Sequence, residues 1–160
     1  MQSRRLLAAP LSLSRGTDSD TLTRMDLLIN IDVPNLDQAV AFYEQAFGLT
    51  ATRRLGAEAA ELGGLPVRLY LLQKPAGSVG AGTDPRRYDR HWTPVHVDVV
   101  VDDIEAALHR AIAAGARAET EIRVHGWGKI AVLADPFGHG FCLIEFLSRG
   151  YDEIADPVRP

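Results

Sequence analysis

Residues 28–48, LINIDVPNLDQAVAFYEQAFG, and residues 96–115, HVDVVVDDIEAALHRAIAAG, are two versions of one pattern. Each begins with apolar residues at every second position, which is typical of a half-buried strand. Each continues with a residue type that caps helices, Asn35 in the first stretch and Asp102 or Asp103 in the second. Asn35 and Asp103 are 68 positions apart, and the same spacing aligns apolar residues that follow them. The pattern therefore predicts a duplicated strand–helix unit.

The helix of each unit has an apolar face and a glycine after its last turn. Gly48 and Gly115 are typical helix stops, so we expect helices near 36–47 and 103–114. Further strand-like runs follow the two helices, at residues 67–72, 130–133 and 141–146. We interpret the chain as a duplicated module of a strand, a helix and several strands; the alternative is a chance likeness of two strand–helix units.

Length and composition restrict the class of protein. The chain has 160 residues, the size of one domain, and its 46% hydrophobic residues are too many for a disordered chain. It has no apolar run of the roughly 18 residues that a membrane-spanning helix needs. A formal charge of −4 does not suit a nucleic-acid-binding protein. The single cysteine, Cys142, excludes an internal disulfide, so we expect a reducing, cytoplasmic location.

The composition also divides the chain. Residues 1–24 are rich in Arg, Ser and Thr without an apolar period, and we interpret them as a disordered leader. A Gly- and Pro-rich stretch then separates the two units and is typical of a linker. The expected organisation is one domain over 25–148, made of modules 25–75 and 94–148 with linker 76–93, and a C-terminal tail over 149–160.

The second unit contains the stretch Asp135-Pro136-Phe137-Gly138-His139, whose residue types favour a type I turn between two antiparallel strands. With this turn, the duplicated unit resembles the vicinal oxygen chelate superfamily, which includes glyoxalase I, bleomycin-resistance proteins and extradiol dioxygenases. The resemblance covers about residues 25–148. It implies an α+β fold, in which two βαβββ modules form a cupped mixed sheet with helices on the outside. It also implies a homodimer.

The resemblance further implies a divalent metal, held by one ligand from the first strand and one from the last strand of each module. His96 matches such a position, whereas its repeat partner Leu28 has no metal-binding atom. Cys142 stands where the last-strand glutamate is expected, and Glu145 is turned to the opposite face by alternation. In the first module the nearest oxygen donor is Gln73. We therefore expect no metal or other cofactor; the alternative is a His96/Cys142 site completed by substrate or a second chain.

A cup without metal can still bind a ligand. Alternation directs one set of side chains into the cup. The polar members of this set are Asn30, Asp32, His96, Asp98 and Cys142, and Ile144 points the same way. The opposite set, Ile29, Ile31, Val97 and Val99, is expected against the helices. The candidate catalytic residues are His96 and Asp98, and the candidate ligand-binding residues are Asn30, Tyr70, Trp92, Trp127 and Cys142. The alternatives are that the polar groups face solvent, that Trp127 packs within a hairpin and that Cys142 is a small buried hydrophobe.

These observations favour a glyoxalase- or bleomycin-resistance-like protein that binds a small organic molecule in the cup without metal. Three alternatives stay open. They are a metal-dependent lyase or dioxygenase, a metal-free isomerase or hydrolase that uses His96 and Asp98 as acid and base, and a dimerisation scaffold. The expected partners are a small molecule and a second copy of the chain, and neither nucleic acid nor membrane.

Overall fold

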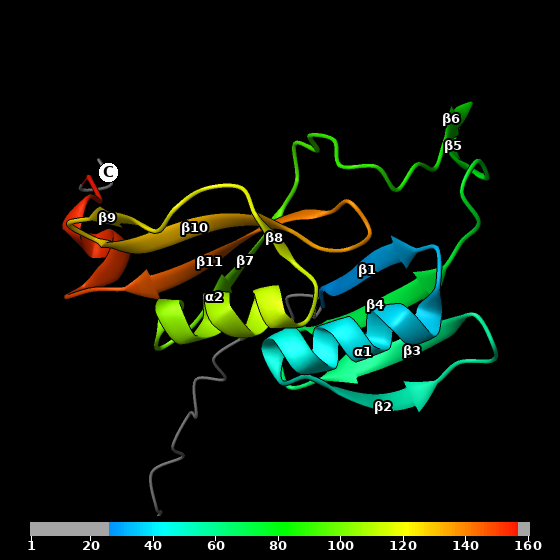
Figure 1. Cartoon of the computed structure of the whole chain (residues 1–160), viewed down its shortest axis with the longest axis horizontal. Helices are drawn as coiled ribbons and strands as arrows, with labels where there is room; N and C mark the ends of the chain where they lie inside the picture. Colours follow the sequence, from blue (N-terminus) through cyan, green and yellow to red (C-terminus); the bar gives the residue numbers. More distant parts are fainter. Residues whose placement is uncertain (1–25, 157–160) are drawn as a thin grey trace, which may run out of the picture.

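The computed structural model describes residues 26–156, so the leader expected over 1–24 lies outside the described residues. Two modules follow each other (Figure 1). The first contains β1 (Leu28–Val33), α1 (Leu36–Phe47), β2 (Thr50–Arg54), β3 (Ala59–Gly63) and β4 (Arg68–Gln73). The second contains β7 (Val97–Val100), α2 (Ile104–Ala113), β8 (Arg117–Ala118), β9 (Arg123–His125), β10 (Gly128–Ala134) and β11 (Gly140–Phe146). The expected helices and the duplicated module are confirmed.

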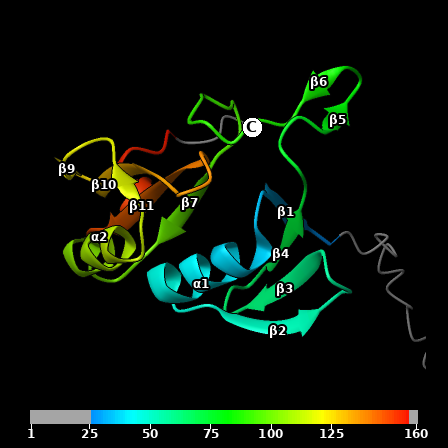
Figure 2. The same cartoon turned by 45° about the vertical axis from the view of Figure 1, so that its right-hand side comes forward.

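Each module forms its own mixed sheet. The strand order is β1-β4-β3-β2 in the first and β7-β11-β10-β8 in the second, where β9 also pairs with β10. The first strand of each module runs parallel to the last, and the other neighbours are antiparallel. Consequently β1 and β7 are both edge strands, and Figure 2 shows them at the facing edges of the two halves. The α+β fold of two βαβββ modules is thus built from two sheets that are not hydrogen-bonded to each other.

The residues that begin the helices act as the sequence predicts. The Asn35 side chain accepts a hydrogen bond from the Gln38 backbone N–H at 3.0 Å, and that of Asp103 accepts one from Ala106 at 2.9 Å. Gly48 ends α1 with a φ of 68°, a left-handed conformation that costs glycine little. These local signals fix where both helices start and where α1 stops.

The last strand of each module adds a second cap to its own helix. The side-chain oxygen of Gln73 accepts from the Leu36 backbone N–H at 2.8 Å, and Glu145 accepts from Ile104 N–H at 2.9 Å. The hydrogen bond to Ile104, followed by the contact with Lys129, lowers the pKa of the Glu145 carboxyl. Both residues therefore face the helix, as alternation predicted for Glu145, and neither belongs to the cup.

Gln73→Ala is expected to lower the free energy of unfolding by about 1 kcal/mol, because a helix N-terminal N–H loses its acceptor. Urea denaturation of the purified protein measures this change. Gln73→Glu is the matched control, since it keeps an oxygen at the same reach and should retain most of the stability. Equal losses in both variants would show that the hydrogen bond is not the source of the effect.

One apolar core joins the modules. Helices α1 and α2 pack against each other, and the α1 residues Phe42 and Phe47 meet the second module. Their rings lie 6.2 Å from that of Phe137 and 5.3 Å from that of Phe141, both in edge-to-face geometry. The shared core fixes the distance between the edge strands β1 and β7.

The linker contacts both modules. It carries the short strands β5 (Val79–Ala81) and β6 (Asp84–Pro85), which pair with each other. Arg86 then pairs with Asp32 of the first module at 2.6 Å, and Arg90 pairs with Glu119 of the second at 2.8 Å. These arginines hold the crossover in place.

The last element of the described chain is the 3-10 helix η1 (Gly150–Glu153), which follows β11. No helix in residues 26–156 is both long and apolar enough to span a membrane.

Candidate functional site

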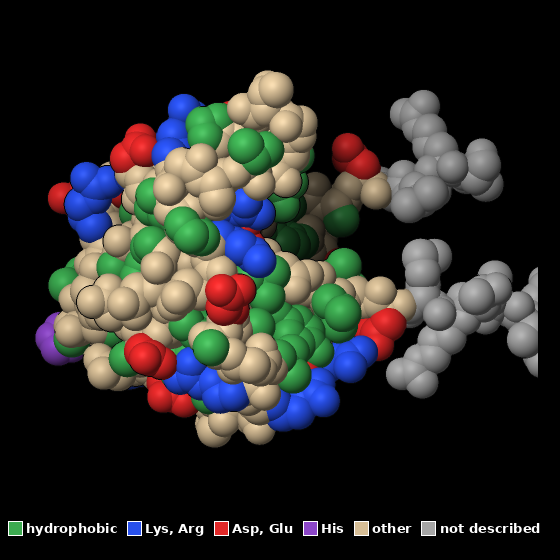
Figure 3. All heavy atoms as spheres, turned by 90° about the vertical axis from the view of Figure 1, so that its right-hand side faces the viewer, with side chains coloured by type: hydrophobic (Ala, Val, Ile, Leu, Met, Phe, Trp, Pro, Cys, Tyr) green, Lys and Arg blue, Asp and Glu red, His purple; other side chains and the backbone are tan. Residues whose placement is uncertain are grey.

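A cavity of about 540 Å³ lies between the two modules. Ile29 and Ile31 of β1 form one wall, Val97 and Val99 of β7 form the other, and Phe47 of α1 contributes from the core side. Figure 3 shows the molecule hollowed on the side of the first module, with hydrophobic side chains around the hollow. A space of this size and lining suits a small, largely apolar molecule.

The position of this cavity corrects the expected lining of the cup. The aliphatic residues Ile29, Ile31 and Val99 do pack on the core, as alternation predicted, but they also line the cavity. Of the polar set, Asn30, Asp32 and His96 line it as well. The reason is that the cavity lies between two strand edges rather than on one sheet face, so side chains from both faces of each strand reach it.

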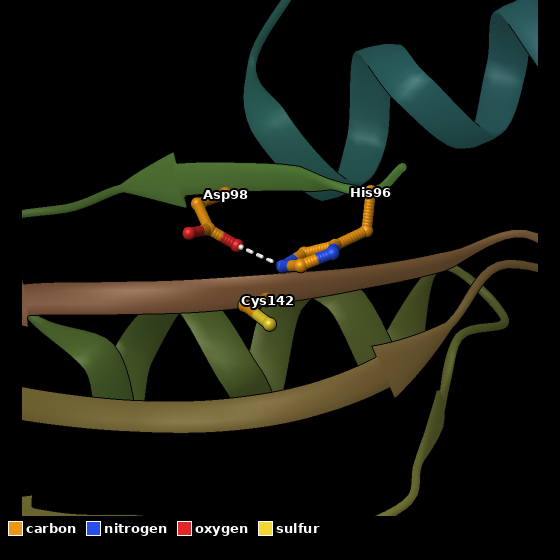
Figure 4. A group of neighbouring side chains, drawn as sticks. All are labelled: His96, Asp98 and Cys142. Atoms are coloured by element: carbon orange, nitrogen blue, oxygen red, sulfur yellow. Dashed lines mark ion pairs between the residues drawn. The ribbon is translucent and has the colours of Figure 1, made fainter. Parts of the chain in front are cut away.

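The residues His96, Asp98 and Cys142 come together on the second module, as the sequence predicted (Figure 4). His96 Nε2 lies 3.3 Å from Asp98 Oδ1, and Cys142 stands opposite Asp98 on the neighbouring strand β11. His96 and Cys142 line a second, smaller cavity of about 100 Å³, together with Trp92. Burial, followed by the nearby Asp98, raises the pKa of the Cys142 thiol to about 11, so the thiol is protonated at neutral pH.

These side chains do not fit the metal site that the superfamily resemblance implies. The donor atoms of His96, Asp98 and Cys142 lie within 4.8 Å of one another, but all three come from one module. In the first module Leu28 offers no ligand, and the carboxylate of Asp32 is bound by an arginine. The soft sulfur of Cys142 in place of a glutamate oxygen is also a poor match for a hard divalent ion.

The remaining candidate residues lie apart from one another. Tyr70 is buried and donates a hydrogen bond to Glu61 at 2.6 Å. Arg53, followed by Tyr70, lowers the pKa of the Glu61 carboxyl to about 2. Trp92 is 72% exposed, with its ring centroid 6.2 Å from that of His96. Tyr70 therefore belongs to a polar network on the first sheet and lines neither cavity.

Trp127 also lies away from both cavities. Its ring stacks on that of His125 with centroids 5.3 Å apart and contacts Tyr151 of η1 at 4.9 Å. This corresponds to the packed hairpin aromatic that was the alternative interpretation. Of the five candidate ligand-binding residues, Asn30 lines the large cavity and Trp92 and Cys142 line the small one, whereas Tyr70 and Trp127 are not part of either lining.

Among the cavity residues that the sequence analysis missed are two with polar groups that meet in the structure, Tyr43 of α1 and His139 of the turn before β11. Both contact the buried carboxylate of Asp135. The signal that was available is the histidine four positions after an aspartate within one turn. It was interpreted only as turn geometry, because the partner Tyr43 is 92 residues distant in the sequence.

A family model described as a glyoxalase-like domain matches residues 28–144. The chain belongs to this glyoxalase-like family. Uncharacterised proteins of Mycobacterium tuberculosis and Mycobacterium bovis are each 28% identical to it over 116 residues. The alignment spans 69% of this chain in both cases, and 68% and 76% of the respective relatives. These relatives add no activity.

Several solved structures share the fold of this glyoxalase-like chain. FosX, a fosfomycin resistance protein of Listeria monocytogenes, has a TM-score of 0.60 at 16% identity, covering 78% of this chain and 94% of its own. A glyoxalase/bleomycin resistance protein/dioxygenase family enzyme of Burkholderia phytofirmans has a TM-score of 0.60 at 19% identity, covering 77% and 100%. TioX of Micromonospora sp. has 0.59 at 20%, covering 78% and 100%. The predicted superfamily is confirmed, and at these identities the likeness concerns the fold alone.

Proposed function

We propose that this glyoxalase-like protein binds a small organic molecule with a largely apolar body in the cavity between its modules, without a metal ion. The observation that carries the proposal is the cavity itself, about 540 Å³ with aliphatic walls. Ligand sites of small molecules fall in this size range and combine apolar walls with a few polar groups. Here the polar groups include Asn30, His96 and His139.

The donor atoms of the site support binding without a metal ion. Aliphatic side chains dominate the cavity, and the three clustered donors His96, Asp98 and Cys142 come from one module only. His96 is then available as a hydrogen-bonding partner of the ligand, next to Asp98. The free, buried thiol of Cys142 suits a reducing compartment, so we also propose a cytoplasmic location.

The test is a thermal-shift screen of small aromatic and aliphatic compounds on freshly purified protein, with and without a chelator. We expect at least one compound class to raise the melting temperature equally in both conditions, because a ligand that binds only the folded state stabilises it. The same preparation should contain less than about 0.1 equivalent of zinc, nickel, iron or manganese by elemental analysis. Stoichiometric metal that is lost in His96→Ala would contradict the metal-free proposal and favour a lyase or dioxygenase instead.

We also propose that the protein is a homodimer. Apolar side chains at or next to the ends of the edge strands β1 and β7 are exposed, 44% for Leu28, 82% for Val95 and 57% for Val100. Sedimentation equilibrium at micromolar concentration is expected to give twice the chain mass of 17.4 kDa. A single species of 17.4 kDa would exclude the dimer.

A further inference from the structure

One wall of the large cavity is backed by a buried carboxylate. In the part of the chain that the structure describes, Asp135 is the only buried residue with a charged side chain, and no atom of this side chain is exposed. It lies in the turn before β11, directly behind His139, which lines the cavity. A buried carboxylate is costly unless every oxygen is hydrogen-bonded, so its partners reveal what it holds in place.

Both oxygens of the Asp135 carboxylate are fully used. Oδ1 accepts from the backbone N–H groups of Phe137 and His139, each at 2.9 Å. Oδ2 lies 2.8 Å from the ring nitrogen Nδ1 of His139 and accepts from the Tyr43 hydroxyl at 3.0 Å. Two backbone N–H groups occupy Oδ1 and the Tyr43 hydroxyl donates to Oδ2, so the carboxylate acts as an acceptor toward these groups. The proton between Oδ2 and the histidine ring therefore belongs to Nδ1.

This assignment determines the chemistry of the other ring nitrogen. In the tautomer that has its proton on Nδ1, the His139 ring carries a lone pair on Nε2. Nε2 has no hydrogen-bond partner among residues 26–156, and no buried side-chain nitrogen or oxygen in that range lacks one, so Nε2 is accessible. Because His139 lines the cavity, Nε2 is the acceptor that this residue can offer to a bound molecule.

Tyr43 does not compete for this role. Burial, followed by the charge of Asp135, raises the pKa of the Tyr43 hydroxyl, so it remains a proton donor to the carboxylate. On the other side of the histidine, Tyr88 packs edge-on at 6.3 Å and donates its own hydroxyl to the Lys74 carbonyl at 2.8 Å. The His139 ring is thus fixed in orientation from two sides while its Nε2 stays unpaired.

We propose that His139 is the ligand-orienting acceptor of the cavity, with Asp135 as its positioning residue, and that the ligand carries an acidic hydroxyl, as in a phenol or an enol, on an apolar body. The hydroxyl proton moves to, or is shared with, Nε2, while the electron pair of the O–H bond stays on the ligand oxygen. Asp135 stabilises the imidazolium that this transfer forms, as a buried carboxylate does for an oriented histidine. This inference rests on the proposed function, because it requires that the cavity binds a molecule.

The experiment compares two probes of nearly equal shape, 4-nitrophenol and its methyl ether 4-nitroanisole, by equilibrium titration. The phenol is expected to bind at least about 10-fold more tightly than the ether, with an increase in phenolate absorbance on binding. In His139→Asn the amide can still donate to Asp135 but the basic nitrogen is gone, so the preference should fall to within about twofold. His109→Asn, at an exposed histidine of α2, is the matched control and should keep the preference.

The outcomes separate this inference from the proposed function. If neither probe binds the wild-type protein, the cavity is not a binding site and both proposals fail. If both probes bind equally, or His139→Asn keeps the preference, the acceptor role is overturned while binding in the cavity stands. Nitrogen-15 NMR of the wild-type histidines tests the geometry without any substitution: the unliganded His139 should show a protonated Nδ1 and an unprotonated Nε2, and the opposite tautomer would overturn the role of Asp135.

Discussion

Asp135→Ala is expected to lower the free energy of unfolding by about 3–5 kcal/mol, the usual cost of removing one partner from a buried charged network. The carboxylate is fully buried and has four hydrogen-bond contacts, with Phe137, Tyr43 and two groups of His139. Its loss leaves buried donors without an acceptor and a small cavity in the shared core. Since a domain of this size is stabilised by roughly 5–15 kcal/mol, much of the total would be lost. Urea denaturation followed by circular dichroism measures the change.

Tyr43→Phe is the matched control for this prediction. It removes one of the four contacts and leaves the carboxylate with three, so we expect a loss of about 1 kcal/mol. The ring of Tyr43 keeps its packing against Phe42, with centroids 5.1 Å apart. If Asp135→Ala cost no more than Tyr43→Phe, the carboxylate would not be the centre of the network.

Local signals predicted the parts of the fold that local physics controls. The helix starts at Asn35 and Asp103 were predicted because a side-chain cap acts over three residues, and the structure has both hydrogen bonds. The strand Ala59–Gly63 was missed because it is short and rich in alanine and glycine, which are uncommon in strands. The strand Thr50–Arg54 was missed because most of its residues are exposed, so it lacks the alternation that marks a half-buried strand.

The candidate site was predicted only where a local pattern places its residues. His96 and Asp98 are two residues apart, so alternation alone places them on one face, where they lie within 3.3 Å. The cavity was not predictable in this way, because its two walls belong to strands 68 residues apart whose spacing is set by the packing of α1 against the second module. Likewise, Tyr43 and His139 meet only through a contact between modules. Such relations depend on tertiary packing and leave no local pattern in the sequence.

Val97→Trp is expected to reduce the affinity for 4-nitroanisole by about 10-fold or more while leaving the free energy of unfolding unchanged or slightly raised. Val97 lies on the β7 wall of the cavity and is half-buried, so a larger side chain extends into the space that a ligand needs. Forcing bulk into an occupied site costs roughly 1–3 kcal/mol, and each 1.4 kcal/mol is a factor of ten in affinity. Without ligand the indole meets an open apolar space, so the folded chain gains apolar contact rather than strain.

Val100→Trp on the same strand is the control that separates blocking from a general effect of tryptophan. Val100 is 57% exposed and lines neither cavity, so its indole should leave the affinity for 4-nitroanisole within about twofold of wild type. Isothermal titration of both variants, with melting curves as a check on folding, measures the difference. Equal affinities in Val97→Trp and Val100→Trp would place the ligand elsewhere. Val97 and Val100 lie on opposite sides of β7, so the two variants add the same ring to different sides of one strand. A loss of affinity confined to Val97→Trp would therefore mean that the ligand occupies the space between β1 and β7.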